Sequence, residues 1–189
     1  MKKRKNSRVK GNRGQNDVAK LLAPWWGEEF ASTPQSGGFA TTRFRNDWNA
    51  AGDIVTPDNS FPFCVEVKHA EGWELEQLIK SDKCDPWAWW NQCVEETPPG
   101  KIPLLVFRRN YRSWHYMMYV HDWIGEYPDL VHVPGRNMSI PVPPSDPLYD
   151  FKRYVIVGLF SDFLQSSKEE WLAWGMNETP KGKLRVINE

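Results

Sequence analysis

The chain has 189 residues, 40% hydrophobic and 25% charged, which is enough for one compact domain with a sizeable core. This composition excludes a disordered chain, and no apolar run reaches the length of a transmembrane helix. Because no apolar segment follows the basic residues 2–5, we predict no secretory signal and expect a cytoplasmic location. The three cysteines show neither paired spacing nor an even count, which argues against a disulfide framework or a structural zinc site.

The formal net charge is zero, but the charge is unevenly distributed along the chain. Residues 2–13 are basic and contain no acidic residue, whereas glutamates accumulate later. Such a segment suits an arm that neutralises phosphates, although a solvated tail has the same composition. The candidate phosphate-binding residues are Lys5, Arg8, Lys10, Arg13, Arg43 and Arg45.

The first half of the chain contains signals for one helix and two strands. Apolar residues at helical spacing predict a helix over residues 15–26, which Pro24 is expected to end early. Residues 32–38 have the composition of a loop. Residues 53–67 then have the pattern of a strand, a turn and a second strand.

The second half alternates between helical and extended patterns. Helical segments are predicted over residues 73–80 and 86–96, and strands over 103–108 and 114–119. Residues 134–147 hold five prolines and are expected to form an irregular connection. A last strand and helix are predicted over residues 154–160 and 161–174. The interleaving predicts a mixed α/β (α+β) domain with a central mixed β-sheet flanked by helices.

Three charged residues around the predicted hairpin form the main chemical signal. Glu66 and Lys68 are two apart on a strand, so their side chains project from one face, while Val67 faces the other way. Asp53 precedes Glu66 by 13 positions, and an antiparallel hairpin turning near Asn59 would place the two carboxylates opposite each other. Two carboxylates and one ammonium would then converge on one patch.

This combination suits the hydrolysis of phosphodiester bonds. Carboxylate oxygens are the hard ligands that Mg²⁺ prefers, and few protein ligands suffice because water and phosphate complete the octahedron. A bound metal ion polarises the phosphate and lowers the pKa of an attacking water. Lys68 would stabilise developing charge or orient that water. An isolated Glu-x-Lys has a surface ion pair as its ordinary interpretation; the preceding aspartate, the turn and the apolar neighbours favour a catalytic one.

These motifs resemble those of the PD-(D/E)XK nuclease superfamily, most closely the archaeal-type and phage Holliday junction resolvases. The resemblance covers residues 10–119, and its specific motifs are Asp53 and Glu66-Val67-Lys68. It implies a restriction-endonuclease-like fold and a Mg²⁺-dependent endonuclease, with Mn²⁺ as a substitute, that cleaves branched DNA as a homodimer. It also implies metal binding by Asp53, Glu66 and the Val67 carbonyl, and assistance to the nucleophile from Lys68.

Three further candidate catalytic residues follow from the same resemblance. Ser36 matches a loop serine and Gln92 a helix glutamine, although ordinary turn chemistry and a solvated helix position explain them equally. Gln15 stands where the family usually has a glutamate, so it offers an amide oxygen without charge. Asp17 lies two positions further along the helix and therefore on nearly the opposite face, so it cannot replace that glutamate. Glu28 and Glu29 are the alternative carboxylates for that role.

The sequence predicts three segments: a basic arm over residues 1–13, a nuclease core over 14–122 and a C-terminal extension packed on the core over 123–189. The expected function is resolution of four-way DNA junctions, for which a C2 homodimer would supply two active sites. One alternative is a restriction-like or nicking endonuclease on duplex DNA. Another is a non-catalytic DNA-binding module on a nuclease scaffold. The numerous tryptophans are expected to fill the core or an interface.

Overall fold

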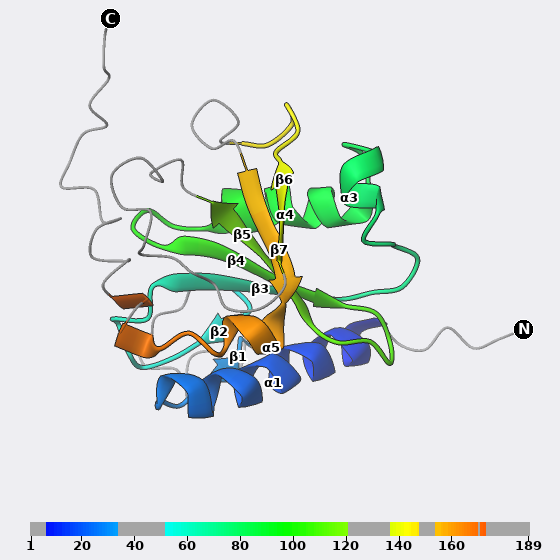
Figure 1. Ribbon diagram of the computed structural model, residues 1–189. Helices are drawn as coiled ribbons and strands as arrows, with labels where there is room; N and C mark the ends of the chain where they lie inside the picture. Colours follow the sequence, from blue (N-terminus) through cyan, green and yellow to red (C-terminus); the bar gives the residue numbers. More distant parts are fainter. Residues whose placement is uncertain (1–6, 34–51, 121–136, 148–153, 170, 173–189) are drawn as a thin grey trace, which may run out of the picture.

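A five-stranded mixed sheet forms the centre of the protein (Figure 1). The computed structural model describes residues 7–33, 52–120, 137–147, 154–169 and 171–172. The sheet has the order β3-β4-β5-β7-β6, with β3 and β4 parallel and the other neighbours antiparallel. Its strands are β3 (Phe63–His69), β4 (Ile102–Arg108), β5 (His115–Val120), β6 (Asn137–Pro141) and β7 (Tyr154–Leu159).

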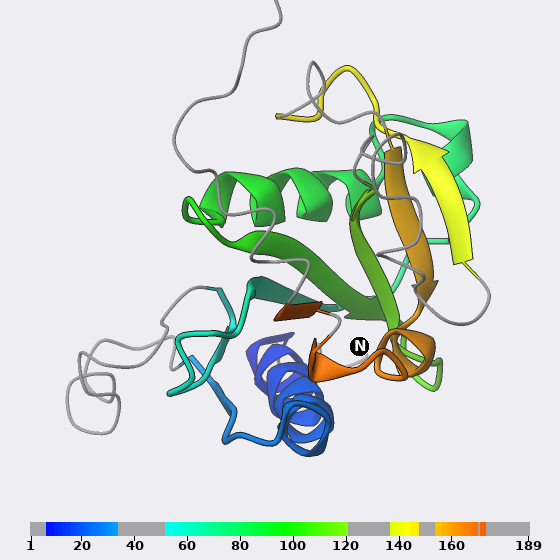
Figure 2. The same ribbon diagram turned by 60° about the vertical axis from the view of Figure 1, so that its left-hand side comes forward.

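Helices cover both faces of this sheet, which confirms the predicted fold class (Figure 2). Helix α1 (Ser7–Trp26) and the short α5 (Phe160–Phe163) lie on one face, and α4 (Asp85–Glu96) lies on the other beside the short α3 (Gln77–Lys80). The alternation of side chains along β3, β4 and β5 supplies both cores. One core joins Leu22, Val65 and Leu104; the other joins Trp90 to Leu105.

The parallel pairing of β3 with β4 requires a crossover connection, which α3 and α4 provide. Cys84 precedes α4 in an extended conformation, and Pro86 occupies its first turn, where a missing N–H costs nothing. The helix ends before the Pro98-Pro99-Gly100 sequence. This crossover lays α4 across β3 and β4 and brings its side chains over the residues of β3.

Helix α1 is longer than the sequence predicted. It begins at Ser7, so residues 7–13 of the predicted arm are its first turns, and Pro24 lies inside it. A proline in the last turn removes a single helical hydrogen bond, and the helix continues to Trp26. It stops at Gly27, whose φ of 81° ends the helix while its N–H still donates to the Ala23 carbonyl at 2.9 Å.

The predicted antiparallel hairpin between residues 53 and 67 is wrong. Strand β2 (Ile54–Val55) pairs instead with β1 (Ala31–Ser32), and the backbone pairing of this segment with β3 is a parallel bridge from Gly52 to Val65. Gly52 has a φ of 78°, and a Cβ there would lie 2.6 Å from the Val65 carbonyl oxygen. Only glycine therefore permits this close approach. A two-residue strand offers too few apolar positions to reveal its partner.

The C-terminal part also differs from the prediction in two places. Residues 137–141 form the edge strand β6, although the proline content of this region suggested an irregular connection. Pro141 is the last residue of an edge strand, a position that tolerates a missing N–H. Helix α5 stops at Phe163, and residues 168, 169, 171 and 172 are helical again, so the helix predicted over residues 161–174 is interrupted after Phe163. The predicted domain boundaries stay predictions, although β7 pairs directly with β5 and so shares the sheet of the core.

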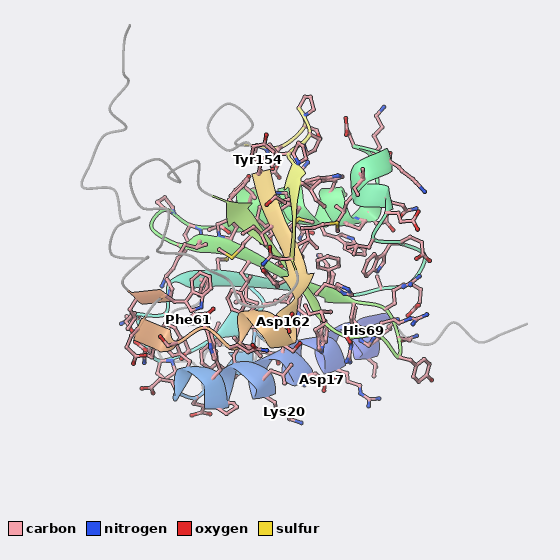
Figure 3. The ribbon with its side chains drawn as sticks, viewed as in Figure 1. Asp17, Lys20, Phe61, His69, Tyr154 and Asp162 are labelled. Atoms are coloured by element: carbon pink, nitrogen blue, oxygen red, sulfur yellow. The ribbon has the colours of Figure 1, made fainter. Side chains whose placement is uncertain are left out.

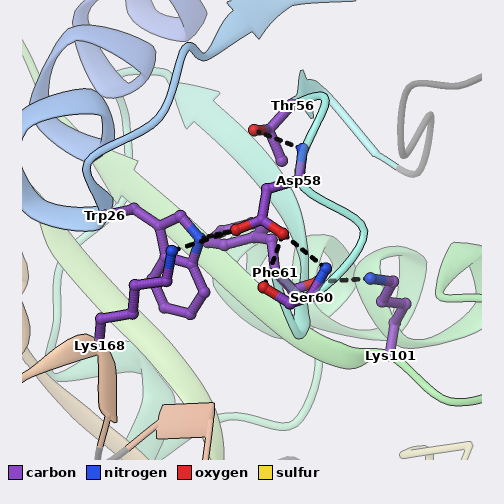
Figure 4. A network of polar contacts seen from close by, with 7 residues as sticks. All are labelled: Trp26, Thr56, Asp58, Ser60, Phe61, Lys101 and Lys168. Atoms are coloured by element: carbon purple, nitrogen blue, oxygen red, sulfur yellow. Dashed lines mark hydrogen bonds and ion pairs between the residues drawn. The ribbon is translucent and has the colours of Figure 1, made fainter.

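A carboxylate, Asp58, ties three distant segments together at one end of the molecule (Figure 4). It accepts hydrogen bonds from Trp26 Nε1 at 2.8 Å and from the Ser60 N–H at 2.8 Å, and it pairs with Lys168 Nζ at 3.2 Å. Burial alone would raise the pKa of Asp58, but these hydrogen bonds together hold it well below its usual range. Asp58 thus fastens the turn before β3 to the end of α1 and to the C-terminal segment.

Most of the described tryptophans lie in the two cores, as expected. Trp26, Trp87 and Trp90 are at most 2% exposed. All three cysteines are buried and free. Within the described ranges, no helix combines the length and apolar character needed to cross a lipid bilayer.

Candidate active site

The candidate site lies at the free edge of β3, between α1 and α4. Val65 and Val67 face α1 and belong to its core, whereas Lys68 faces the other way and contacts α4. Glu66 shares the face of Lys68, pairs with it at 2.6 Å and is only 7% exposed. Because β4 covers just one edge of β3, the other edge is available to the segment that carries Asp53.

Asp53 is held at this edge by its backbone and by both oxygens of its side chain. Its N–H donates to the Val65 carbonyl at 2.8 Å. Its carboxylate accepts one bond from the Val67 N–H at 2.9 Å and another from Gln15 Nε2 at 2.6 Å. Each carboxylate oxygen retains a further lone pair after these bonds, so Asp53 can still coordinate a cation.

The Val67 carbonyl lies on the same edge as Asp53. Within a strand, the N–H and C=O of one residue point to the same side. The Val67 N–H points to Asp53, whereas the carbonyl of Pro62 and the N–H of Ala70 bond to the β4 side. The odd-numbered residues of β3 therefore direct their backbone groups to the free edge, and the Val67 oxygen faces the region of the two carboxylates.

Helix α4 supplies a polar chain that reaches the lysine. Lys68 Nζ donates to Gln92 Oε1 at 2.9 Å, and Gln92 Nε2 donates to Glu96 Oε1 at 2.9 Å. Gln92 was among the predicted site residues, whereas Glu96 was not. The spacing of four residues on a helix places Gln92 and Glu96 on one face, and this spacing was the available signal.

The electrostatics of the site oppose the charged form of both carboxylates. Burial raises the pKa of Asp53, and the hydrogen bonds from Val67 and Gln15 offset this only in part. Burial also raises the pKa of Glu66, and the nearby charge of Asp53 raises it further despite the Lys68 partner. The charge of Glu96 acts in the same direction on both groups. A cation at this position would relieve the repulsion between them.

The donor set fits a small divalent cation that keeps part of its water shell. Asp53, Glu66 and the Val67 carbonyl offer hard oxygen atoms, and Mg²⁺ commonly uses only one or two carboxylates besides water and phosphate. In the part of the chain that the structure describes, there is no group of three or more His, Cys, Asp or Glu side chains suited to a metal ion. A cation held by these three groups would take its remaining oxygen ligands from water and phosphate.

The remaining candidate residues fall outside this group. Ser36, Lys5, Arg43 and Arg45 lie outside the described residues, and of Arg8 only the backbone, within α1, is described. Lys10 pairs with Glu71 at 2.7 Å, and Arg13 is exposed on α1. Asp17 pairs with Arg108 at 2.7 Å, which agrees with its expected direction away from the site.

A mixed sheet whose edge strand carries Glu-x-Lys beside a separate aspartate is the arrangement of the PD-(D/E)XK nucleases. The chain matches the family described as "Phage putative PDDEXK endonuclease" over residues 6–173, and it belongs to that family. It is also similar to Protein D14 of Escherichia phage T5, with 30% identity over 118 residues that cover 58% of this chain and 68% of that protein. No solved structure matches the chain.

The raised carboxylate pKa values give a prediction for stability without metal. Because the folded state binds these protons more tightly than the unfolded chain does, the site's contribution to the free energy of unfolding increases as pH falls through the raised pKa values. The charged form of the site therefore lowers the free energy of unfolding. Asp53→Asn removes one charge, and its amide can accept from Val67 and donate to a rotated Gln15.

We therefore expect Asp53→Asn in metal-free buffer at neutral pH to unfold at the same temperature as the wild type or a higher one. The advantage should shrink in acid, where the wild-type carboxylate is protonated as well. Thermal unfolding across a pH series measures both effects. A loss of more than about 1 kcal/mol at neutral pH, the usual value of a broken hydrogen bond, would show that the charge stabilises the fold.

Proposed function

We propose that this protein is a divalent-metal-dependent DNA endonuclease that hydrolyses phosphodiester bonds at the site of Asp53, Glu66 and Lys68. One observation carries the proposal. Two partly buried carboxylates with raised pKa values lie at a strand edge beside the Val67 carbonyl and the Lys68 ammonium. A purely structural ion pair needs one carboxylate for one ammonium, whereas this group has an excess of negative charge in a desolvated place.

In this proposal each residue of the site has its own role in cation binding or in phosphate hydrolysis. Asp53, Glu66 and the Val67 carbonyl would hold the cation, with Mg²⁺ as the expected ion and Mn²⁺ as a substitute. When bound, the cation supplies Lewis-acid polarisation of the phosphate and lowers the pKa of a water molecule. Lys68 then offers its ammonium to the negative charge that develops on the phosphate oxygens. Gln92 accepts from Lys68 at 2.9 Å and limits where that ammonium can go.

Gln15 acts as a positioning residue in this proposal. Its Nε2 donates to Asp53 at 2.6 Å, and the side chain is buried at 3% exposure. A glutamate at this position would add a third negative charge and could not donate. Gln15 instead fixes one Asp53 oxygen without raising the local charge, which suits a site that holds one cation.

Substitution of the three charged residues tests the chemistry. We expect Asp53→Asn, Glu66→Gln and Lys68→Ala each to reduce metal-dependent DNA cleavage by roughly a hundred-fold or more, because each removes a cation ligand or the ammonium. All three should keep the circular dichroism spectrum of the wild type. Glu95→Gln and Lys83→Ala, at exposed positions, are matched controls that should cleave normally. Wild-type rates in any of the three site variants would refute the assignment.

For the substrate, we propose branched DNA, with the four-way junction as the leading candidate and a C2 homodimer as the active form. The support is the resemblance of the Asp53 and Glu66-Val67-Lys68 motifs to the junction resolvases. Two symmetrical cuts need two equivalent active sites, and an isologous dimer supplies them.

A comparison of four DNA substrates tests this choice. With Mg²⁺, the protein should cut four-way junctions of unrelated sequence and spare the corresponding linear duplexes, because a branch presents a shape rather than a sequence. A fork and single strands complete the set. Cleavage of linear duplex at one sequence would identify a restriction-like or nicking enzyme instead. Metal-independent binding without any product would identify a non-catalytic DNA-binding module.

A further inference from the structure

The connection between β4 and β5 presents an unusual aromatic side chain. Tyr111 is 103% exposed, and its φ of 59° makes it the only non-glycine residue in the described ranges with a positive φ. The left-handed backbone conformation is unfavourable for a residue with a bulky side chain. An aromatic ring that is fully exposed to water also contributes no packing energy to the fold. The fold therefore maintains two unfavourable features at one position.

The tip that carries Tyr111 is firmly held from both sides. The Asn110 N–H donates to Glu71 Oε1 at 2.7 Å, and the same oxygen pairs with Lys10 of α1 at 2.7 Å. Arg109 pairs with Glu74 and lies over the Trp73 ring, 5.6 Å from its centroid. These contacts fix the tip against α1 and against the segment that follows β3.

A second set of contacts anchors the base of the same hairpin. Arg108 pairs with Asp17 at 2.7 Å and lies over the Trp114 ring at 4.1 Å from its centroid. His69, at the end of β3, contacts the edge of Trp114 and lies between the sheet and α1 (Figure 3). The tip is thus a rigid projection, and a partner that binds Tyr111 loses little conformational entropy in ordering it.

The charges around the tip narrow the choice of partner. Arg108, Arg109 and Lys10 have acidic partners, so they serve the architecture rather than a broad phosphate-binding patch. Arg112 is exposed beside Tyr111. An exposed flat ring with a neighbouring cation matches a nucleotide, whose base stacks on the ring and whose phosphate attracts the cation.

The tip also lies within reach of the candidate active site. The chain from Lys68 to Glu71 spans at most about 11 Å between Cα atoms. Glu71 in turn bonds the backbone of Asn110 beside Tyr111. In the sheet His69 lies opposite Arg108, three residues before Tyr111, so a DNA strand that follows β3 from the carboxylates towards His69 would approach the tip.

We propose that Tyr111 is a binding site for an unpaired DNA base, which stacks on its ring next to the cleavage site. The proposal rests on the proposed nuclease function and deepens it, because a base is free to stack only where strands separate, at a branch, a fork or a single strand. Arg112 contributes attraction to the adjacent phosphate. The interior of a fully paired duplex offers the ring no base face, so only the two terminal base pairs of a blunt duplex can stack on it.

Binding measurements in EDTA, where no cleavage occurs, test this proposal separately from catalysis. We compare a forked DNA, a single strand and a blunt duplex, with 2-aminopurine in the unpaired arm of the fork. Tyr111→Asn removes the ring but tolerates the left-handed conformation, and Tyr111→Phe keeps the ring. Tyr154→Thr is the matched control, because Tyr154 is an exposed tyrosine at the distant end of β7 (Figure 3).

We expect Tyr111→Asn to bind the fork and the single strand about ten-fold more weakly, the usual loss for one stacked base, with less than about two-fold change on the duplex. Tyr111→Phe and Tyr154→Thr should bind like the wild type. Quenching of 2-aminopurine should persist in Tyr111→Phe and disappear in Tyr111→Asn.

The proposal is overturned if Tyr111→Asn binds the fork normally, or if it loses affinity equally for fork and duplex. It is also overturned if Tyr111→Phe is as weak as Tyr111→Asn, because a hydroxyl contact would then replace stacking. A changed oligomeric state of Tyr111→Asn with normal DNA binding would assign the tip to a protein interface. If the wild type still cleaves DNA with Mg²⁺ alongside any of these results, the proposed nuclease function remains valid. If the wild type neither binds nor cleaves DNA, both the nuclease function and the Tyr111 base-binding site are refuted.

Discussion

The hydrogen bond from the Val67 N–H to the Asp53 carboxylate, at 2.9 Å, is the interaction on which the site depends. An edge strand exposes unpaired backbone groups, and proteins must cover them or use them. Here the short segment around Gly52 and Asp53 occupies the edge of β3 with one backbone bond and one side-chain bond. It leaves the Val67 carbonyl on the same edge. The edge is thereby protected from pairing with another strand, and in the proposed function it becomes the place that holds a cation.

The two carboxylates lower the free energy of unfolding, and the packing of the rest of the fold offsets this loss. Asp53 and Glu66 oppose each other's ionisation in a partly desolvated position. Aromatic and aliphatic cores on both faces of β3 hold the strand in place regardless of the state of the site. Groups placed against their own electrostatic preference typically mark function, because selection for stability alone would replace them with apolar or neutral residues.

Much of the fold and part of the site follow from the sequence. The alternation of side chains along a strand predicts that Glu66 and Lys68 share one face of β3. Apolar segments flanked by turn-forming residues predict α4, β4, β5 and β7. The position of Asp53 does not follow, because β2 has only two residues and pairs with β1, whose position in the chain lies far away. A hairpin is the nearest guess for two strand-like segments, yet Gly52 makes a parallel bridge instead.

Other features depend on tertiary contacts that the pattern of residues in the sequence does not reveal. Helix α1 extends through a basic segment because its first turns dock against other elements, as the Lys10 pair with Glu71 illustrates. The proline content around Pro141 conceals the edge strand β6. The four-residue spacing indicates that Gln92 and Glu96 share a helix face, but only the tertiary contact of Gln92 with Lys68 shows that this face meets the site. The positive φ of Tyr111 likewise could not be predicted, because a tyrosine in the sequence does not indicate a left-handed backbone conformation.

The most direct measurement of the central claim is a calorimetric titration with Mn²⁺ in two buffers of different ionisation enthalpy. If Asp53, Glu66 and the Val67 carbonyl hold a cation, the chain should bind one Mn²⁺, and the number of protons released should increase as the pH is lowered, because both carboxylates have raised pKa values. Glu66→Gln should lose this binding, and Asp82→Asn, at an exposed position, should keep it. Equal Mn²⁺ affinity in the wild type and Glu66→Gln, or no Mn²⁺ binding by the wild type, would contradict the account.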